Sequence, residues 1–406
     1  MSRSFEECRK IGLEVLKPSE SELQHGLELH QESLVWDAYG FAPIGQGTYP
    51  EQIRQIIAAG AGRDEISDAI EEFNMLGSLE LPRMLEQITE AWNWSGVDCV
   101  FQNAGVEGNS IEQLIKRLSC FTYVADRHSE LYSRVVFPEQ IITAKENSKR
   151  CLYLTTNGVP VPHEIDSVES ALDTLKVFFR LGVRMMHLTY NRRNLIGDGC
   201  AEKTNAGLSD FGREIIWEMN RVGIIPDVAH SGQRTSLEAA QCSNKPVVAS
   251  HSVAGKLSSH YRAKNDETIS AIVKSGGYIG ICAIPAFYRG SGYIDSFLDH
   301  IDYVAKKYGT DYVAIGTDHG TKVGAPDPKP LNLPARRPIF EKFWPKVDSQ
   351  FIIDADAQGS KMFDSVAWTN WPLFTVGLVQ RNYSDKDIKK IIGGNVQRVA
   401  QETLEA

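Results

Sequence analysis

The chain has 406 residues, of which 42% are hydrophobic and 23% are charged, a composition typical of a globular protein with a large core. The net charge at pH 7 is −9 and no Lys/Arg run stands out, which disfavours nucleic acid and anionic membranes as partners. The first residues lack the apolar segment of a signal peptide, and we find no apolar run long enough to span a membrane. The seven cysteines are scattered without a CxxC pair, so we expect reduced thiols in a cytoplasmic protein.

Residues 1–32 have a helical pattern and predict an N-terminal helical extension. Eight apolar runs follow and alternate with helical segments. Their continuous apolar character is typical of strands buried on both faces, as in a parallel sheet. The eight runs are 33–39, 97–103, 151–157, 184–190, 224–230, 246–251, 278–283 and 312–318.

The clearest helix between these runs lies between Ser209, a suitable N-cap, and Gly223, a suitable C-terminal glycine. Eight strands that alternate with helices predict an α/β fold, a (β/α)8 TIM-like barrel over residues 33–406. Residues 319–372 follow the eighth run and are rich in proline and aromatic residues. We predict that this long loop is a lid or a subunit interface.

Two histidines lie where strand-like runs end, 21 residues apart: His230 in IIPDVAH and His251 in PVVASH. The carboxyl ends of barrel strands form the active-site rim, so both imidazoles are expected at one mouth. Two histidines alone make a weak metal site, because catalytic zinc usually has three protein ligands. Asp318, which ends the eighth run, is a candidate third ligand. His319 follows it and is either a functional residue or a solvent-facing loop residue.

Several longer motifs occur together from residue 182 onward. GVRMMHLTYN, GLSDFGREIIWEMNRVGIIPDVAHSG, PVVASHS, IGTDHG and GGNVQRV together resemble the renal (membrane) dipeptidase family, the M19 metallopeptidases with an amidohydrolase-like barrel. The resemblance covers about residues 30–400. It implies hydrolysis of a small dipeptide, a two-zinc centre and a homodimer. It also implies that His230 and His251 are zinc ligands, that Arg262 binds the substrate carboxylate, and that Asp318 is part of the site.

Other positions depart from the family pattern. Where the family has a ligand His and a ligand Asp after the first strand, this chain has Tyr39 and Phe41. The family's bridging Glu maps to Asn157, and its fourth-strand His maps to Tyr190. We interpret Glu107 in GVEG as a decoy, because that motif follows the second strand. Phenylalanine cannot bind zinc, and tyrosine and asparagine are poor ligands at neutral pH, so a two-metal centre is not expected.

The first hypothesis is therefore a dipeptidase-like hydrolase that acts on a small carboxylate-bearing amide with at most one Zn²⁺. The ion would be held by His230 and His251, with Asp318 as the third ligand or the proton acceptor. Arg262 would bind the substrate carboxylate, since a planar guanidinium matches a carboxylate. Tyr190 would stabilise the oxyanion.

Three further residues are candidates for substrate binding: Tyr39, Asn157 and His319. For Tyr39 the alternative is aromatic filling of the volume left by a lost ligand. For Asn157 the alternative is a turn residue before a glycine. We interpret His187 as a core imidazole.

Two other classes of function stay open. A lyase, decarboxylase, dehydratase or isomerase of a small organic acid could use the same scaffold with one metal or none, because fold does not fix chemistry. A non-catalytic binding protein is the third reading. The joint presence of His230, His251, Arg262 and Asp318 argues against it.

Overall fold

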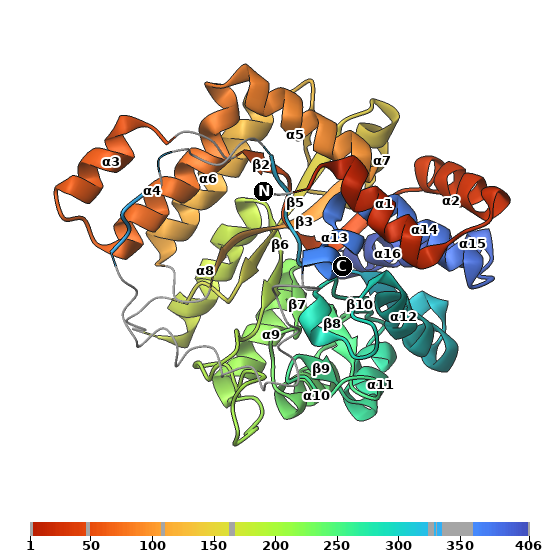
Figure 1. Ribbon diagram of the computed structural model, residues 1–406. Coiled ribbons are helices and arrows are strands. Elements are labelled where there is room, and N and C mark those ends of the chain that lie inside the picture. The colour runs from red at the N-terminus through yellow and green to blue at the C-terminus, as the bar shows by residue number, and fades with distance from the viewer. Residues whose placement is uncertain are drawn as a thin grey trace.

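The computed structural model describes residues 3–45, 49–106, 110–161, 167–323, 329, 331–334 and 360–404. Its centre is a curled parallel sheet with helices around it (Figure 1), which confirms the predicted barrel. Each of the eight predicted runs overlaps one barrel strand, although several strands begin or end outside the run. In the described part of the chain the barrel strands are β1 (Trp36–Gly40), β3 (Cys99–Val106), β5 (Arg150–Asn157), β6 (Val183–His187), β7 (Ile225–Asp227), β8 (Ala249–Ala254), β10 (Ile279–Ile281) and β11 (Val313–Ile315).

Backbone pairing closes the barrel. Parallel pairing runs from β1 through β3, β5 and β6 to β7, and from β8 through β10 to β11. A parallel bridge between Asp227 and Val248 joins the two sheets. Asp318 N donates to Tyr39 O at 2.9 Å and so links the end of β11 to β1. Closure brings the carboxyl ends of the strands to one mouth.

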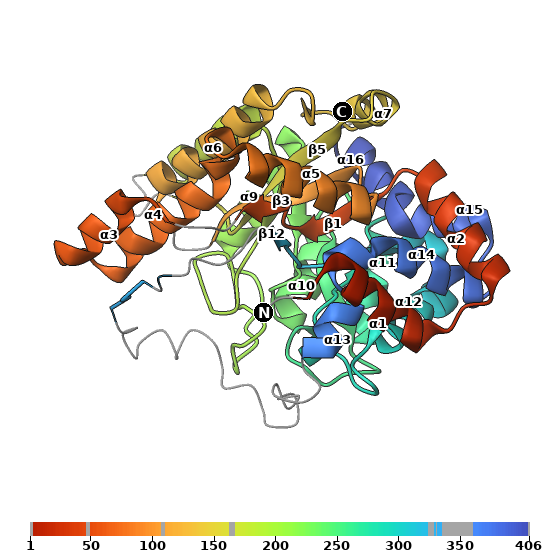
Figure 2. The ribbon, with the colours of Figure 1, turned by 45° about the horizontal axis from the view of Figure 1, so that its top comes forward.

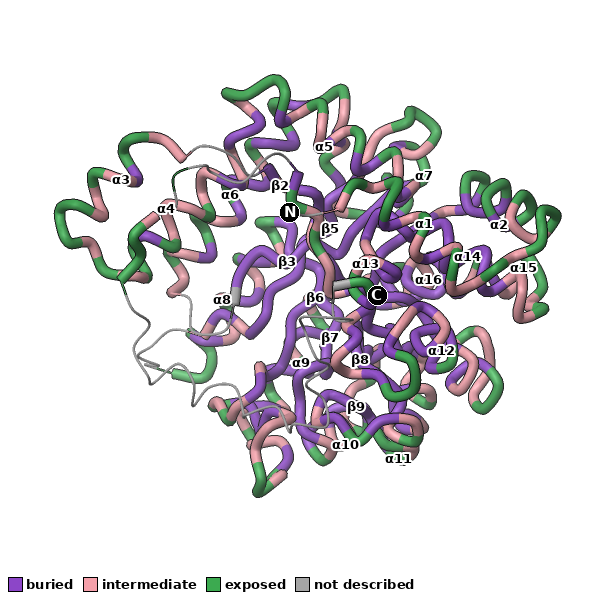
Figure 3. The backbone as a smooth tube through the Cα atoms, in the orientation of Figure 1, coloured by how far each residue is buried: buried purple, intermediate pink, exposed green. Residues whose placement is uncertain are grey.

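The strands are buried along most of their length (Figure 3), because helices cover their outer face and their own side chains fill the interior. Trp36, Phe101 and Tyr153 pack together inside the barrel with ring centroids 5.1–5.4 Å apart. This aromatic layer lies below the strand ends and gives the polar side chains at the mouth a rigid apolar floor.

The helix predicted between Ser209 and Gly223 is α9 (Asp210–Val222). Ser209 Oγ accepts from Gly212 N at 2.9 Å, and Gly223 ends the helix with φ 96°. Because only glycine adopts this φ readily, both ends are determined by local residues. The other helices and short strands after β1 are β2 (Ile44–Gly45), α3 (Glu51–Ala58), α4 (Arg63–Leu76), α5 (Pro82–Ser95), α6 (Ile111–Arg127), β4 (Tyr132–Arg134), α7 (Pro138–Glu146), α8 (Val168–Arg180), α10 (Gln233–Cys242), β9 (Ala263–Lys264), α11 (Asp266–Lys274), α12 (Ile294–Tyr308), α15 (Asp385–Lys389) and α16 (Asn395–Leu404).

Helices α1 (Phe5–Leu16) and α2 (Glu20–Glu32) precede the barrel, which confirms the predicted N-terminal helices. They pack against two helices from the other end of the chain, α13 (Ser360–Ser365) and α14 (Trp371–Gln380) (Figure 2). Of the predicted loop 319–372, the described parts include β12 (Lys322–Val323), which pairs with β2, and α13. Residues 324–328, 330 and 335–359 lie outside the described residues, so a lid or interface there stays a prediction.

All seven cysteines are free thiols, and five of them are buried. None of the helices in the described ranges has the length and apolar character needed to cross a bilayer.

Buried His30 provides a pH-dependent link from α2 to α14 and to the end of α5. Its Nδ1 lies 2.8 Å from Thr375 Oγ1, and its Nε2 lies 2.9 Å from Ser95 O. Burial lowers the pKa of His30 from 6.5 to about 4. Because the unfolded chain binds the proton more tightly, the stabilisation that neutral His30 contributes is fully present above pH 6.5. It is lost as the pH falls from 6.5 through 4.

The free energy of unfolding falls between pH 7 and pH 4. We expect this fall to be smaller in His30→Gln, by up to about 3 kcal/mol. Urea unfolding at both pH values measures this difference. His25→Gln, at an exposed position of the same helix, is the matched control. Equal slopes for His30→Gln and the unmodified protein would show that other groups cause the acid sensitivity.

Candidate active site

His230 and His251 lie side by side at the barrel mouth, as their positions in the sequence predict. Their Nε2 atoms are 3.0 Å apart, and both side chains are buried. His230 Nδ1 lies 2.8 Å from Asn191 Oδ1, and His251 Nδ1 lies 2.8 Å from Ser250 Oγ. Burial and the nearby charge of Arg262 hold the pKa of both imidazoles well below the usual value. Both rings are therefore neutral near pH 7, the state in which imidazole binds metal ions.

A tyrosine ring stacks on each of these imidazoles. Tyr39 lies on His251 with centroids 3.9 Å apart, and Tyr190 lies on His230 at 4.2 Å. The Tyr39 hydroxyl donates to Asn157 Oδ1 at 2.9 Å. Burial raises the pKa of both phenols, so they stay protonated and can act as hydrogen-bond donors.

The loop after β6 holds Tyr190 and Asn191 in place. The backbone of Gly199 passes so close that a Cβ there would lie 2.4 Å from Tyr190 O and 2.3 Å from Asn191 C. Asp198 stabilises the same loop, because its carboxylate accepts hydrogen bonds from Thr204 Oγ1 at 2.9 Å and from Ala206 N at 2.6 Å. The turn chemistry expected for the sequence GDGC thus positions two side chains that contact His230.

Arg262 lies next to the backbone that carries the two imidazoles and is only 1% exposed. Its Nε donates to Ala229 O at 3.3 Å and its Nη2 donates to His251 O at 2.9 Å. These bonds fix one side of the guanidinium and tie it to the backbone beside both histidines. No carboxylate forms an ion pair with Arg262 in the described part of the chain. A buried cation held in this way is suited to an anionic group of a ligand.

Asp318 follows β11 in a left-handed backbone conformation, φ 55°, which Asp tolerates better than most residues. Although the residue keeps some exposed surface, burial raises the pKa of its carboxyl group to about 6. The positive charge of Arg262 partly opposes that rise, so the guanidinium lies within electrostatic reach of the carboxylate. A carboxyl group with a pKa near neutrality is suited to proton transfer.

His319 points toward a different neighbour. Its ring stacks on Phe363 of α13 with centroids 5.9 Å apart, and burial lowers its pKa to about 4. Its Nε2 has no hydrogen-bond partner among the described residues. His319 therefore packs against α13, and its role in substrate binding stays a prediction.

Two buried residues at the site were not predicted to be functional: His187 and Asp227. They end adjacent strands β6 and β7 and are register partners, and His187 Nε2 lies 2.6 Å from Asp227 Oδ2. The His187 ring lies 5.2 Å from the rings of His230 and His251. The interpretation of His187 as a buried imidazole is correct, but its neighbours are other imidazoles and a carboxylate. The signal in the sequence was a polar residue near the end of each of two consecutive apolar runs.

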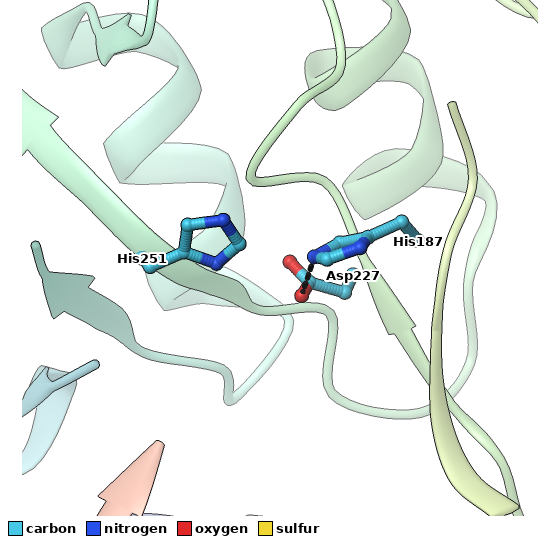
Figure 4. A group of neighbouring side chains, drawn as sticks. All are labelled: His187, Asp227 and His251. Atoms are coloured by element: carbon cyan, nitrogen blue, oxygen red, sulfur yellow. Dashed lines mark ion pairs between the residues drawn. The ribbon is translucent and has the colours of Figure 1, made fainter. Parts of the chain in front are cut away.

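Figure 4 shows the Asp227 carboxylate between the imidazoles of His187 and His251. One ligand atom from each of the three lies within 4.8 Å of the others, and all three side chains are buried. In the described part of the chain, no such group combines Asp318 with two histidines.

Comparison with known proteins agrees with this fold. Residues 47–329 match the family described as membrane dipeptidase, peptidase family M19. This chain belongs to the M19 membrane dipeptidase family. It is 23% identical to dipeptidase tcpJ of Claviceps purpurea over 340 residues, which cover 81% of this chain and 70% of that protein. It is 31% identical to the uncharacterized dipeptidase C965.12 of Schizosaccharomyces pombe over 188 residues, 44% of each protein.

Solved structures show the same fold. An amidohydrolase from Pseudomonas aeruginosa matches with a TM-score of 0.67 at 24% identity, over 93% of this chain and 98% of that one. A metallopeptidase from Rhodobacter sphaeroides, liganded with a phosphinate mimic of the dipeptide L-Ala-D-Ala, matches with a TM-score of 0.62 at 15% identity. That match covers 92% of this chain and 100% of the other.

The expectation that this M19 protein binds at most one metal ion stays a prediction, and it rests on the kinds of donor groups at the mouth. Where the family resemblance implies ligands of a second ion, the structure places a phenol hydrogen-bonded to an amide (Tyr39 and Asn157) and the hydrocarbon ring of Phe41. None of these is a good zinc ligand. Imidazole and carboxylate donors gather instead on β6, β7 and β8. Glu107 lies outside the described residues, so its interpretation as a decoy stays a prediction.

Proposed function

We propose that this M19-family hydrolase uses one divalent metal ion, with zinc as the first candidate, to cleave the amide bond of a small substrate that carries a carboxylate. The observation that carries the proposal is the arrangement around the neutral imidazoles of His230 and His251. The buried cation Arg262 and the carboxyl group of Asp318 flank them. This combination provides a metal-binding group, an anion-binding group and a proton acceptor within one site.

Each residue has a distinct part in the proposed reaction. A bound ion would polarise the scissile carbonyl and lower the pKa of a water molecule. Arg262 binds the substrate carboxylate and so fixes the amide relative to the imidazoles. Asp318 takes a proton from the attacking water and returns it to the leaving amine. The hydroxyl of Tyr190 donates a hydrogen bond to the developing oxyanion.

The second candidate is a lyase, decarboxylase, dehydratase or isomerase of a small organic acid. The Tyr39 to Asn157 hydrogen bond favours it, because protonated phenol and amide groups at the mouth suit proton transfer on an enolate or alkoxide. The homodimer, the identity of the metal as zinc and the cytoplasmic location remain predictions. A small substrate is common to both candidates.

Isotope labelling separates the two candidates. The protein is incubated in H₂¹⁸O with a panel of dipeptides, N-acyl amino acids and small organic acids. The masses of the products are measured by mass spectrometry. Hydrolysis places one ¹⁸O atom in the new carboxylate, and we expect activity to fall on chelation and to return with Zn²⁺. The matching C-terminal amides, which lack the carboxylate, are the control and are expected to react poorly. Conversion of organic acids without incorporation of ¹⁸O would contradict hydrolysis and support the second candidate.

A further inference from the structure

We propose that the metal ion is held one layer deeper in the barrel than the family resemblance implies, by His187, Asp227 and His251. This inference rests on the proposed function for the presence of an ion, and it assigns the ligands from this chain's own geometry. His251 is the ligand shared with the family pattern. His187 and Asp227 take the place of the donors that are absent at positions 39, 41 and 157.

The first argument is the distance between donor atoms. Two ligand atoms on one tetrahedral zinc ion lie about 3.3 Å apart, given metal–ligand distances of about 2.0–2.1 Å. His187 Nε2 and Asp227 Oδ2 are 2.6 Å apart, and the three ligand atoms of the group lie within 4.8 Å of one another. Changes of up to about 1.5 Å in these separations bring two imidazoles and a carboxylate around one ion, which is a donor set that zinc prefers.

The second argument is the unsatisfied state of His187. The side chain is fully buried, and its Nδ1 has no hydrogen-bond partner among the described residues. Its Nε2 is paired with Asp227 Oδ2 at 2.6 Å. Buried polar atoms almost always have partners, and exceptions call for an explanation such as an ion. A cation between His187 and Asp227 would satisfy the imidazole nitrogen and the carboxylate together.

The third argument is the support behind Asp227. Its Oδ1 accepts from Ala229 N at 2.9 Å and from Ser250 N at 3.1 Å, which fixes the carboxylate plane. The Ser250 hydroxyl donates to Oδ2 and also contacts His251 Nδ1, so one residue orients two of the proposed ligands. Metal-binding carboxylates and imidazoles are usually oriented by such hydrogen bonds from outer residues.

A comparison with Asp37 supports this assignment. Asp37 is also fully buried in the barrel, but its carboxylate accepts from Thr317 N at 2.9 Å, from Thr317 Oγ1 at 2.6 Å and from Trp368 Nε1 at 3.1 Å. No imidazole forms an ion pair with it in the described part of the chain. Asp37 therefore joins β1 to the end of β11, whereas Asp227 faces imidazoles.

Cobalt binding tests the assignment without an activity assay. The full-length protein is stripped of metal, titrated with Co²⁺, and examined by visible absorption and by metal analysis. We expect one Co²⁺ per chain in the unmodified protein and at least about 100-fold weaker binding in His187→Gln. His187→Cys should restore binding and add a sulfur-to-cobalt charge-transfer band in the near ultraviolet. His319→Gln is the control from the same mouth, and we expect it to bind Co²⁺ like the unmodified protein.

Circular dichroism checks that each variant is folded. If His187→Gln does not fold, the charge-transfer band of His187→Cys still tests the assignment. Unchanged affinity in folded His187→Gln, or no sulfur-to-cobalt band in His187→Cys, would overturn the assignment. An unmodified protein that binds no Co²⁺ would overturn it as well, even if it hydrolyses amides. A cobalt site that depends on His187, in a protein that cleaves no amide, would refute the proposed function and leave this assignment intact.

Discussion

Asp318→Asn is expected to lower kcat for amide hydrolysis by a factor of about 10²–10⁴, the usual contribution of a general acid–base group. The amide cannot take the proton of the attacking water. Asparagine adopts the left-handed backbone conformation as readily as aspartate, so φ 55° at this position can be kept and the barrel mouth stays intact. The loss should therefore appear in kcat with little change in KM.

Steady-state kinetics at saturating substrate measure this effect. Asp311→Asn, an exposed aspartate before β11 that pairs with Lys390 at 2.7 Å, is the matched control and should leave kcat unchanged. Co²⁺ affinity measured on Asp318→Asn separates proton transfer from metal binding. Unchanged kcat would exclude Asp318 as the base. Loss of Co²⁺ binding in Asp318→Asn would show that Asp318 is a metal ligand.

Arg262→Met is expected to lower kcat/KM for carboxylate substrates by about 100-fold or more, because loss of one partner of a buried charge pair costs about 2–5 kcal/mol. Arg262 also supports the backbone, since it donates to Ala229 O and His251 O. Part of the loss will therefore come from the imidazole loops. The carboxylate contribution has to be separated from this structural part.

Substrate pairs provide that separation. In the unmodified protein, a substrate with a C-terminal carboxylate should react far better than its carboxamide, and in Arg262→Met this preference should disappear. Arg262→Lys keeps the charge but not the planar pair of donors, so we expect an intermediate preference. If Arg262→Met still prefers the carboxylate as strongly as the unmodified protein does, another group binds it.

The barrel and the position of the imidazole pair were predictable from the sequence, because both depend on short stretches of chain. Each barrel strand overlaps a predicted apolar run, and the two ends of α9 are set by Ser209 and Gly223. In a closed parallel barrel, residues that end strands meet at one mouth whatever the details of packing. His230 and His251 were therefore expected to be neighbours, and their Nε2 atoms are 3.0 Å apart.

Only the tertiary structure decided which side chains inside the mouth touch. His187 and Asp227 are 40 positions apart in the chain and become partners through the register of β6 on β7, which local periodicity does not specify. The Tyr39 to Asn157 hydrogen bond joins β1 to β5 past the intervening β3, and His319 meets Phe363 only because α13 packs nearby. Strand and helix patterns depend on residues that are close in the sequence, whereas these contacts depend on strand register and barrel closure.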